Sequence, residues 1–311
     1  MSPEETARAL AALTEHPGKR ALFSEDSFFR EGLSDARVAL GDVLPTALAP
    51  IALVLFKPDA VAARKVAPAL ALLREDGFAP VAAAPLAFTG PVIHALWRYQ
   101  IRRNTIDKIR LYTRWASRVP ALLVLFRDEA DGRPLRGAAR MSAAKGPALV
   151  ERREPWHLRT RLGSPNSILN FLHSADEMVD VLRELPILAD ADVRPRLLAA
   201  IRTGADAGDL APVLADLAAR IPEHDADPRA AALRLRAAAA GMPGAPARDL
   251  VERIDATLSG RSRLDLYALE TAIAALGLEP DPLDVFAFGS HFIDRDIAGL
   301  VGEIEAAGAR A

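Results

Sequence analysis

The feature that most constrains the fold is a run of six apolar residues, Ile51-Ala-Leu-Val-Leu-Phe56, which lies between Pro50 and Pro58. A short apolar run with such boundaries predicts a buried strand. Residues 66–76 then have apolar side chains at helical spacing, and Gly77 follows at the position of a C-cap glycine. A strand followed by a helix therefore opens the middle of the chain.

The same alternation continues to about residue 188. Further strands are predicted at 78–88, 119–126 and 167–172, and helices at 91–101, 104–117, 134–144 and 175–185. This order, β-α-β-α-α-β-α-loop-β-α, predicts an α+β fold of the ferredoxin-like (split βαβ) kind, with helices packed on a four-stranded antiparallel sheet.

Helical patterns flank this region on both sides. Residues 1–48 form a helical N-terminal extension, which opens with a predicted capping box between Ser2 and Glu5. Residues 189–311 are expected to form an all-helical C-terminal domain, in which Asp281-Pro282 marks one helix start. Together with the central domain at 49–188, the sequence predicts three parts.

Composition limits the classes of function. The formal net charge of −2 gives no basic excess for binding a nucleic-acid backbone. The absence of cysteine excludes disulfides and thiolate metal sites. No uncharged apolar run is long enough to span a membrane, and the acidic N-terminus does not resemble a signal peptide. We therefore expect a cytoplasmic protein without membrane or nucleic-acid partners.

Two polar residues next to predicted strands are candidates for chemistry. Lys57 directly follows the first strand, where its ammonium group can reach a phosphate or carboxylate; the alternative is a solvated strand end. His173 follows the fourth predicted strand and is either a structural residue or a nucleophile. Glu184, on the following helix, can hold one ring nitrogen and leave the other free to react.

Arginines between the third and fourth predicted strands are candidates for anion binding. Arg140, Arg159 and Arg161 lie in this segment. Guanidinium groups bind phosphate oxygens in a bidentate manner. In a chain this rich in arginine, each of them is equally well explained as a surface charge.

Several short segments follow one another in a distinctive order. They are FKPDAV at 56–61, Gly77-Phe78, VPALLVLF at 119–126, ARMSAAKGPA at 139–148, PWHLR at 155–159 and NFLHSADE at 170–177. In this order they resemble the nucleoside diphosphate kinases, whose motifs are K-P-D-G-V, Gly-Phe, GPVVAMVL, R-x-x-x-G-x-T-x-P-A, P-G-T-I-R and N-x-x-H-G-S-D. The resemblance covers residues 49–188, and the spacing of Glu184 from His173 agrees with it.

The resemblance implies a transferase that carries the γ-phosphoryl group of ATP or another nucleoside triphosphate through a phosphohistidine to an acceptor, in that family a nucleoside diphosphate. His173 would be the nucleophile, supported by Glu184, and Lys57 would contact the phosphoryl group. Magnesium would bridge the nucleotide phosphates, with no metal site built from protein side chains.

The resemblance also implies a set of nucleotide-binding residues. Arg140 and Arg159 would hold the phosphate chain, Asn170 would contact the ribose, and Tyr99 would correspond to a tyrosine near the phosphates. Lys145 stands near the position of a phosphate-binding threonine and could bind phosphate in its place.

Some positions depart from the family pattern. Ser174 and Ala175 replace the glycine and serine after the histidine, and no aromatic residue takes the base-stacking position among Ile106, Lys108 and Ile109. Two alternatives therefore stand beside the first: an ATP-dependent phosphotransferase with a small-metabolite acceptor, and a non-catalytic nucleotide-sensing or interaction protein. The helical C-terminal region could bind a protein partner or a second copy of the chain.

Overall fold

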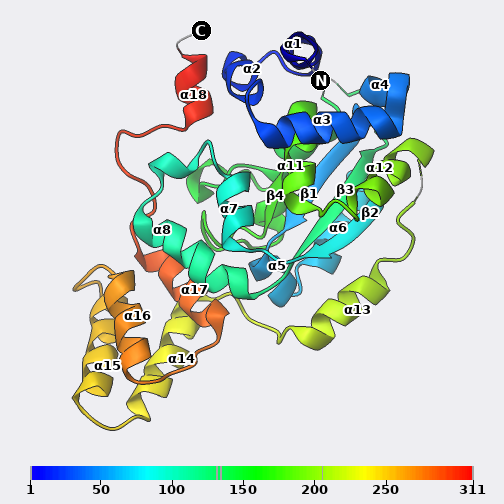
Figure 1. Cartoon of the computed structure of the whole chain (residues 1–311). Helices are drawn as coiled ribbons and strands as arrows, with labels where there is room; N and C mark the ends of the chain where they lie inside the picture. Colours follow the sequence, from blue (N-terminus) through cyan, green and yellow to red (C-terminus); the bar gives the residue numbers. More distant parts are fainter. Residues whose placement is uncertain (1, 131, 134, 205, 310–311) are drawn as a thin grey trace.

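The centre of the protein is a four-stranded antiparallel sheet with the strand order β2-β3-β1-β4 (Figure 1). This computed structural model describes residues 2–130, 132–133, 135–204 and 206–309. The strands are β1 (Ile51–Phe56), β2 (Phe78–Leu86), β3 (Ala121–Asp128) and β4 (Leu172–Ser174). The prediction of a mixed α+β region around a four-stranded antiparallel sheet is confirmed.

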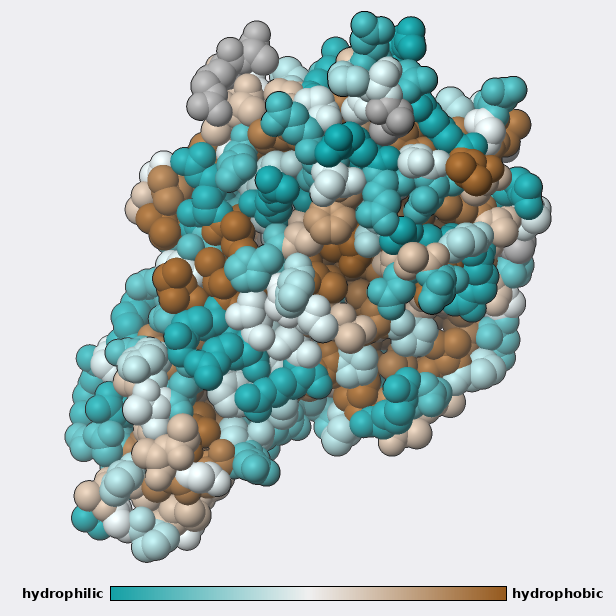
Figure 2. Space-filling model, viewed as in Figure 1, coloured by the Kyte–Doolittle hydropathy of each residue, from teal (hydrophilic) through white to brown (hydrophobic). Residues whose placement is uncertain are grey.

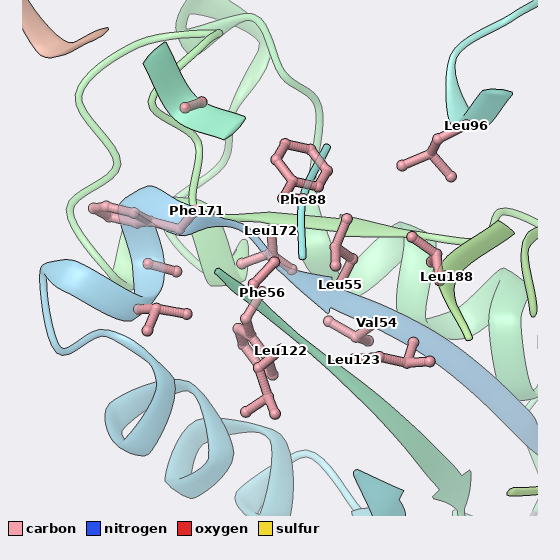
Figure 3. Packing of buried hydrophobic residues seen from close by; sticks show 14 of the residues in the cluster. Val54, Leu55, Phe56, Phe88, Leu96, Leu122, Leu123, Phe171, Leu172 and Leu188 are labelled. Atoms are coloured by element: carbon pink, nitrogen blue, oxygen red, sulfur yellow. The ribbon is translucent and has the colours of Figure 1, made fainter. Parts of the chain in front are cut away.

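The first strand forms the middle of the core. All six residues of β1 are buried, because β3 and β4 pair with it on either side. Figure 3 shows Val54, Leu55 and Phe56 packed close to Leu122 and Leu123 of the neighbouring strand. Burial of each large apolar side chain contributes roughly 1.5–3 kcal/mol. The predicted buried strand is therefore confirmed.

Short helices connect the strands. They are α5 (Pro58–Ala62), α6 (Val66–Glu75), α7 (Gly90–Leu96), η2 (Ile101–Arg103), α8 (Ile106–Arg110), η3 (Leu111–Trp115), η4 (Ala116–Arg118), α9 (Gly137–Lys145), η5 (Val150–Arg152), α10 (Leu158–Arg161) and α11 (Met178–Leu188). The helices predicted here are present with shifted ends. Pro134, the predicted start of one of them, lies outside the described residues. The last helix starts at Met178, because Glu177 and Asp180 form a capping box there.

The prediction of a strand at 167–172 is wrong. The amides of Ile168 and Leu169 donate to Oδ1 of Asn166, at 2.8 and 2.9 Å, so a side chain folds this segment into a turn. Phe171 then adopts a left-handed backbone conformation with φ of 64°. Strand β4 starts only at the next residue, which places His173 inside the strand.

The N-terminal helices pack on the same body. They are α1 (Pro3–Leu13), α2 (Pro17–Phe23), α3 (Ser27–Leu40), η1 (Gly41–Val43) and α4 (Leu44–Leu48). The predicted capping box between Ser2 and Glu5 is confirmed. Helix α3 lies directly against α11, and a Cβ atom on Gly32 would stand 1.8 Å from the carbonyl oxygen of Leu182. This close approach requires glycine at that position.

The described residues beyond 188 that form regular structure are helical. The helices are α12 (Arg194–Thr203), α13 (Ala211–Arg220), α14 (Pro228–Ala240), α15 (Ala245–Leu258), α16 (Leu266–Ala275), α17 (Pro282–Phe292) and α18 (Glu303–Gly308). Asp281 caps α17 as predicted, because its side chain accepts from the amide of Leu283. In Figure 1, α14, α15 and α16 form a group at the lower left, whereas α12 lies beside the sheet. The division into three domains stays a prediction.

The C-terminal segment returns along the central region. The amide of Thr105 donates to the carbonyl of Arg295 at 3.2 Å, and the amide of Ile297 donates to that of Arg103 at 2.7 Å. Helix α18 then lies beside α2, where a Cβ atom on Gly18 would stand 2.0 Å from the carbonyl oxygen of Ile304. The last helix and the first helices are therefore neighbours (Figure 1).

The surface seen in Figure 2 is mixed, with hydrophilic residues interspersed with smaller hydrophobic areas. Among the described residues, no helix combines the length and the apolar character needed to cross a bilayer.

Candidate active site

The centre of the candidate site is a contact between His173 on β4 and Glu184 on α11. Nε2 of His173 lies 2.9 Å from Oε2 of Glu184. This contact favours the tautomer that carries its proton on Nε2, so the Nδ1 lone pair is left for another partner. Within the described part of the chain, no group forms a hydrogen bond with Nδ1, and the side chain is 20% exposed.

An aromatic wall borders the imidazole. The ring of Trp97, which follows α7, meets the ring of His173 edge-on, with centroids 6.1 Å apart and planes at 89°. Tyr112, on η3, packs against the same tryptophan with a centroid distance of 5.1 Å. These contacts hold the histidine ring between Trp97 and the carboxylate of Glu184.

A strained residue sets the position of β4. Phe171 has a φ of 64°, which costs a non-glycine residue about 1–3 kcal/mol. Its amide donates to Oδ2 of Asp59 at 3.0 Å, and its carbonyl accepts from the amide of Lys57 at 2.9 Å. The end of β1 therefore fixes the strand that carries His173.

Lys57 is buried at the end of β1. Its Nζ donates to the carbonyl of Ile168 at 2.6 Å and lies 3.5 Å from the hydroxyl oxygen of Tyr112 and 3.6 Å from Oδ1 of Asp59. Burial lowers the pKa of Lys57 to about 8, although the Asp59 carboxylate opposes this effect, and the nearby charge of Arg159 lowers the pKa further. This ammonium group is therefore poorly solvated and loses its proton at lower pH than an exposed lysine does.

Two more cations lie along the outer edge of β4. Arg159 donates to the carbonyl of Leu172 at 2.7 Å, and Lys145 donates to the carbonyl of Ser174 at 3.3 Å. Burial lowers the pKa of both groups, that of Arg159 to about 10. The residues immediately before and after His173 are thus each held by a buried cation.

Two polar groups complete this part of the site. Asn170 is buried in the turn before β4, where its Nδ2 donates to the carbonyl of Ser167 at 2.9 Å. Asp176 accepts from Lys145 at 3.3 Å and from the hydroxyl of Ser142 at 2.5 Å. The contact of Asn170 with a ribose stays a prediction.

Tyr99 is not part of this cluster. Its hydroxyl donates to Oδ2 of Asp26 at 2.7 Å, and its ring stacks on Phe23 at 5.6 Å. Arg183 donates to the same oxygen of Asp26 at 2.8 Å. Tyr99 is therefore a buried residue of the N-terminal helix packing, and Tyr112 is the tyrosine that accompanies Lys57.

Arg140 is held elsewhere as well. Its guanidinium donates to both carboxylate oxygens of Asp128, at 2.8 and 2.6 Å, and lies 3.8 Å from the centroid of the Phe78 ring. Asp128 is at the end of β3 that pairs with the beginning of β1, whereas Lys57 follows the end of β1. A buried carboxylate therefore keeps Arg140 at the opposite end of the sheet from Lys57.

Three residues of the site were not predicted. Asp59 lies within the FKPDAV segment, so its position two residues after Lys57 was the available signal. Trp97 and Tyr112 lie on the helical connection between β2 and β3, and no spacing in the sequence links them to His173.

Two adjoining hollows lie along α9 and share Ala143 and Trp156 in their linings. One, of about 420 Å³, is lined by Lys145, Arg159, Asp176, Trp156 and their neighbours. The other, of about 720 Å³, is also lined by Trp156, together with Arg161 and residues of α9. The two buried cations that bind the carbonyls of Leu172 and Ser174 therefore border a space that an anion can enter.

The similarity to known proteins is limited to part of the chain. No protein-family model matches the chain, and no curated protein matches its sequence. Solved structures similar to part of it include the nucleoside diphosphate kinase of Aquifex aeolicus, with 18% identity, a TM-score of 0.37, and coverage of 45% of this chain and 95% of that one. Another is the nucleoside-diphosphate kinase of Borrelia burgdorferi with bound vanadate and ADP, with 17% identity, a TM-score of 0.38, and coverage of 46% and 88%. A likeness at these values does not show a function for this chain.

Proposed function

We propose that this protein is a nucleoside diphosphate kinase-like phosphotransferase, which moves the γ-phosphoryl group of a nucleoside triphosphate through a phosphohistidine at His173. The observation that carries the proposal is the hydrogen bond from Nε2 of His173 to Glu184, which leaves Nδ1 available on a strand whose flanking carbonyls, those of Leu172 and Ser174, bind the cations Arg159 and Lys145. The strand order β2-β3-β1-β4 supports the ferredoxin-like arrangement expected for such a domain.

The reaction consists of two displacements at phosphorus. In the first, the Nδ1 lone pair attacks the γ-phosphorus, the bond from that phosphorus to the bridging oxygen breaks, and the diphosphate leaves with the electron pair. In the second, a phosphate oxygen of the acceptor attacks the phosphohistidine, and the phosphorus–nitrogen bond breaks. Glu184 holds the Nε2 proton and stabilises the positive ring while phosphorus is attached.

The cations stabilise the charge that is transferred. Phosphoryl transfer needs positioning and charge neutralisation more than covalent help from the protein. Lys57, Lys145 and Arg159 are buried, so their fields are less screened by water than those of surface cations. In this proposal they contact the phosphate oxygens, and the hydrogen bonds that Lys145 and Arg159 make to the β4 carbonyls set their positions.

Magnesium belongs to the nucleotide in this proposal. Among the described residues, no group of three or more carboxylates and histidines could hold a metal ion. A magnesium ion would be ligated by the phosphates of the nucleotide it accompanies.

Labelling with [γ-³²P]ATP and magnesium tests the proposal. The folded protein should acquire a label that is stable in base and labile in acid, and His173→Ala should remove it, with a loss on the order of 10⁴-fold or more. His291→Ala is the matched control, because this histidine is exposed on α17. Folded wild-type protein that acquires no label, or equal labelling of His173→Ala, would contradict the proposal.

A chase experiment identifies the acceptor. Nucleoside diphosphates added to the labelled protein should remove the label and yield labelled triphosphates. If no diphosphate removes the label but a small metabolite does, the acceptor belongs to the chemical class of that metabolite.

A further inference from the structure

Trp156 is unusual among the tryptophans of this chain. Its side chain is 58% exposed, whereas Trp115 is buried and Trp97 is half-buried. Its ring lies against the imidazole of His157, with centroids 4.0 Å apart, and this contact restrains its orientation. A large, exposed and restrained aromatic ring is a suitable surface for stacking a planar ligand.

The tryptophan lies at the boundary of the two hollows described above. The larger one, of about 720 Å³, is also lined by Pro155 and Leu135, by the arginines Arg133, Arg140 and Arg161, and by the carboxylates Glu75 and Asp76. Arg161 is already paired with Glu75 at 2.8 Å. This hollow therefore offers an apolar and aromatic wall with guanidinium groups around it, which suits a flat heterocycle better than a compact anion.

The smaller hollow, of about 420 Å³, offers a different chemistry. Lys145 and Arg159 line it, and Asp176 is the carboxylate among its lining residues. Because Asp176 is paired with Lys145, at 3.3 Å, the guanidinium of Arg159 gives this hollow an excess of positive charge. The same two cations bind the carbonyls on either side of His173. This hollow suits a chain of phosphates that leads from Trp156 toward β4.

We propose that Trp156 stacks on the base of the nucleotide, whose phosphate chain runs through the smaller hollow past Lys145 and Arg159 toward His173. This inference rests on the proposed function and names the binding surface for the base of its substrate. Stacking on an aromatic ring accepts any base, because every base has a π-face. The site should therefore bind nucleotides with little preference among bases.

Binding of ADP, measured by calorimetry and by quenching of tryptophan fluorescence, tests the inference. We expect Trp156→Ala to weaken ADP binding roughly tenfold, because one base–aromatic stack is lost. The quenching of tryptophan fluorescence by ADP should disappear in the same variant. Trp156→Phe keeps a stacking ring and should retain affinity within about threefold. Inorganic tripolyphosphate has no base, so its affinity should be the same in all three proteins.

Tyr267→Ala is the matched control, since this aromatic residue is 64% exposed on α16. Unchanged ADP affinity in Trp156→Ala, or an equal loss for tripolyphosphate, would overturn the inference. Its failure is distinguishable from that of the proposed function. Unchanged ADP affinity in a Trp156→Ala protein that still forms phosphohistidine refutes the stacking surface alone, whereas Trp156-dependent ADP binding without any phosphohistidine supports the surface and refutes the transferase.

Discussion

Oε2 of Glu184 lies 2.9 Å from Nε2 of His173, and the two residues come from consecutive elements, β4 and α11. The carboxylate is largely buried, so its hydrogen bond to the imidazole is not readily replaced by water. The pair therefore fixes both the tautomer and the rotation of the ring, and these are the properties that a nucleophilic histidine requires.

Replacing this carboxylate should slow phosphohistidine formation more than it weakens nucleotide binding. In Glu184→Gln the amide keeps the size of the side chain but no longer carries the charge that stabilises the ring. We expect labelling to slow on the order of 10²-fold, with ADP affinity nearly unchanged. Rapid-quench labelling and calorimetry measure the two quantities. Glu252→Gln, at an exposed site on α15, is the control, and a wild-type labelling rate in Glu184→Gln would contradict the role.

The buried ammonium of Lys57 predicts a pH dependence of phosphate binding. Burial lowers its pKa to about 8, so the cation is present below that pH and is lost as pH rises through it. Tripolyphosphate affinity should fall by about tenfold between pH 7 and pH 9, because the protonated fraction of a group with this pKa falls by about that factor. Calorimetry at both pH values measures the fall.

Lys57→Met separates this effect from other titrations, because it removes the ammonium and keeps an unbranched side chain. The variant should bind tripolyphosphate weakly at both pH values, and its remaining pH dependence belongs to the ligand and to other groups. An identical fall in wild type and Lys57→Met would show that Lys57 does not bind the phosphates.

Arg140 should matter for stability and not for chemistry. Its pair with Asp128 is largely buried, so Arg140→Ala should lower the free energy of unfolding by about 3 kcal/mol, with a wild-type rate of His173 labelling. Arg152→Ala, an exposed arginine of η5, is the control. Urea unfolding measures the loss of stability. Slow labelling of folded Arg140→Ala would show that this arginine takes part in the reaction.

The same pair should lose its effect in acid. Burial alone would raise the pKa of Asp128, but hydrogen bonds from Arg140 and from the amide of Gly137 hold it below the ordinary value. A lowered folded-state pKa gives stability that is complete above the ordinary carboxylate pKa and disappears as pH falls through the folded value. The difference between wild type and Arg140→Ala should therefore shrink at low pH.

Glu270 should hold the C-terminal helices against the central region. Its carboxylate accepts from Nε1 of Trp115 at 2.8 Å and from Arg114 at 3.0 Å, and it also accepts from Arg110. Glu270→Ala should cost about 1.5–3 kcal/mol and shift the fluorescence of Trp115 to longer wavelength as water reaches the indole. Glu279→Ala, exposed after α16, is the control, and unchanged emission and stability would contradict this role.

Local sequence signals predicted those parts of the fold that depend on neighbours in the chain. The burial of β1 was predicted from six consecutive apolar residues, and the caps at Ser2 and Asp281 from residues within a few positions of the helix starts. Each of these predictions is confirmed. The boundary of β4 was wrong because the side chain of Asn166 folds the preceding residues into a turn. Such competition between a side chain and the strand ladder is not visible in hydrophobic pattern alone.

The candidate site shows the same limit. His173, Glu184 and Lys57 were selected by motif and spacing, and the structure brings the first two into contact. Trp97 and Tyr112 lie on the connection between β2 and β3. No pattern in the sequence of that connection indicates that it folds against His173. Arg140 lies away from Lys57 because the Asp128 carboxylate binds it, and that partner could be identified only from three-dimensional contacts.

The contact of α18 with α2 has a consequence for biosynthesis. Translation releases α2 long before α18, which carries the carbonyl of Ile304 that packs against Gly18. The nascent protein must therefore expose this face of α2 while nearly three hundred residues are added. A chain that stalls on the ribosome before α18 would therefore hold a complete central sheet but would lack the contact between Gly18 and Ile304.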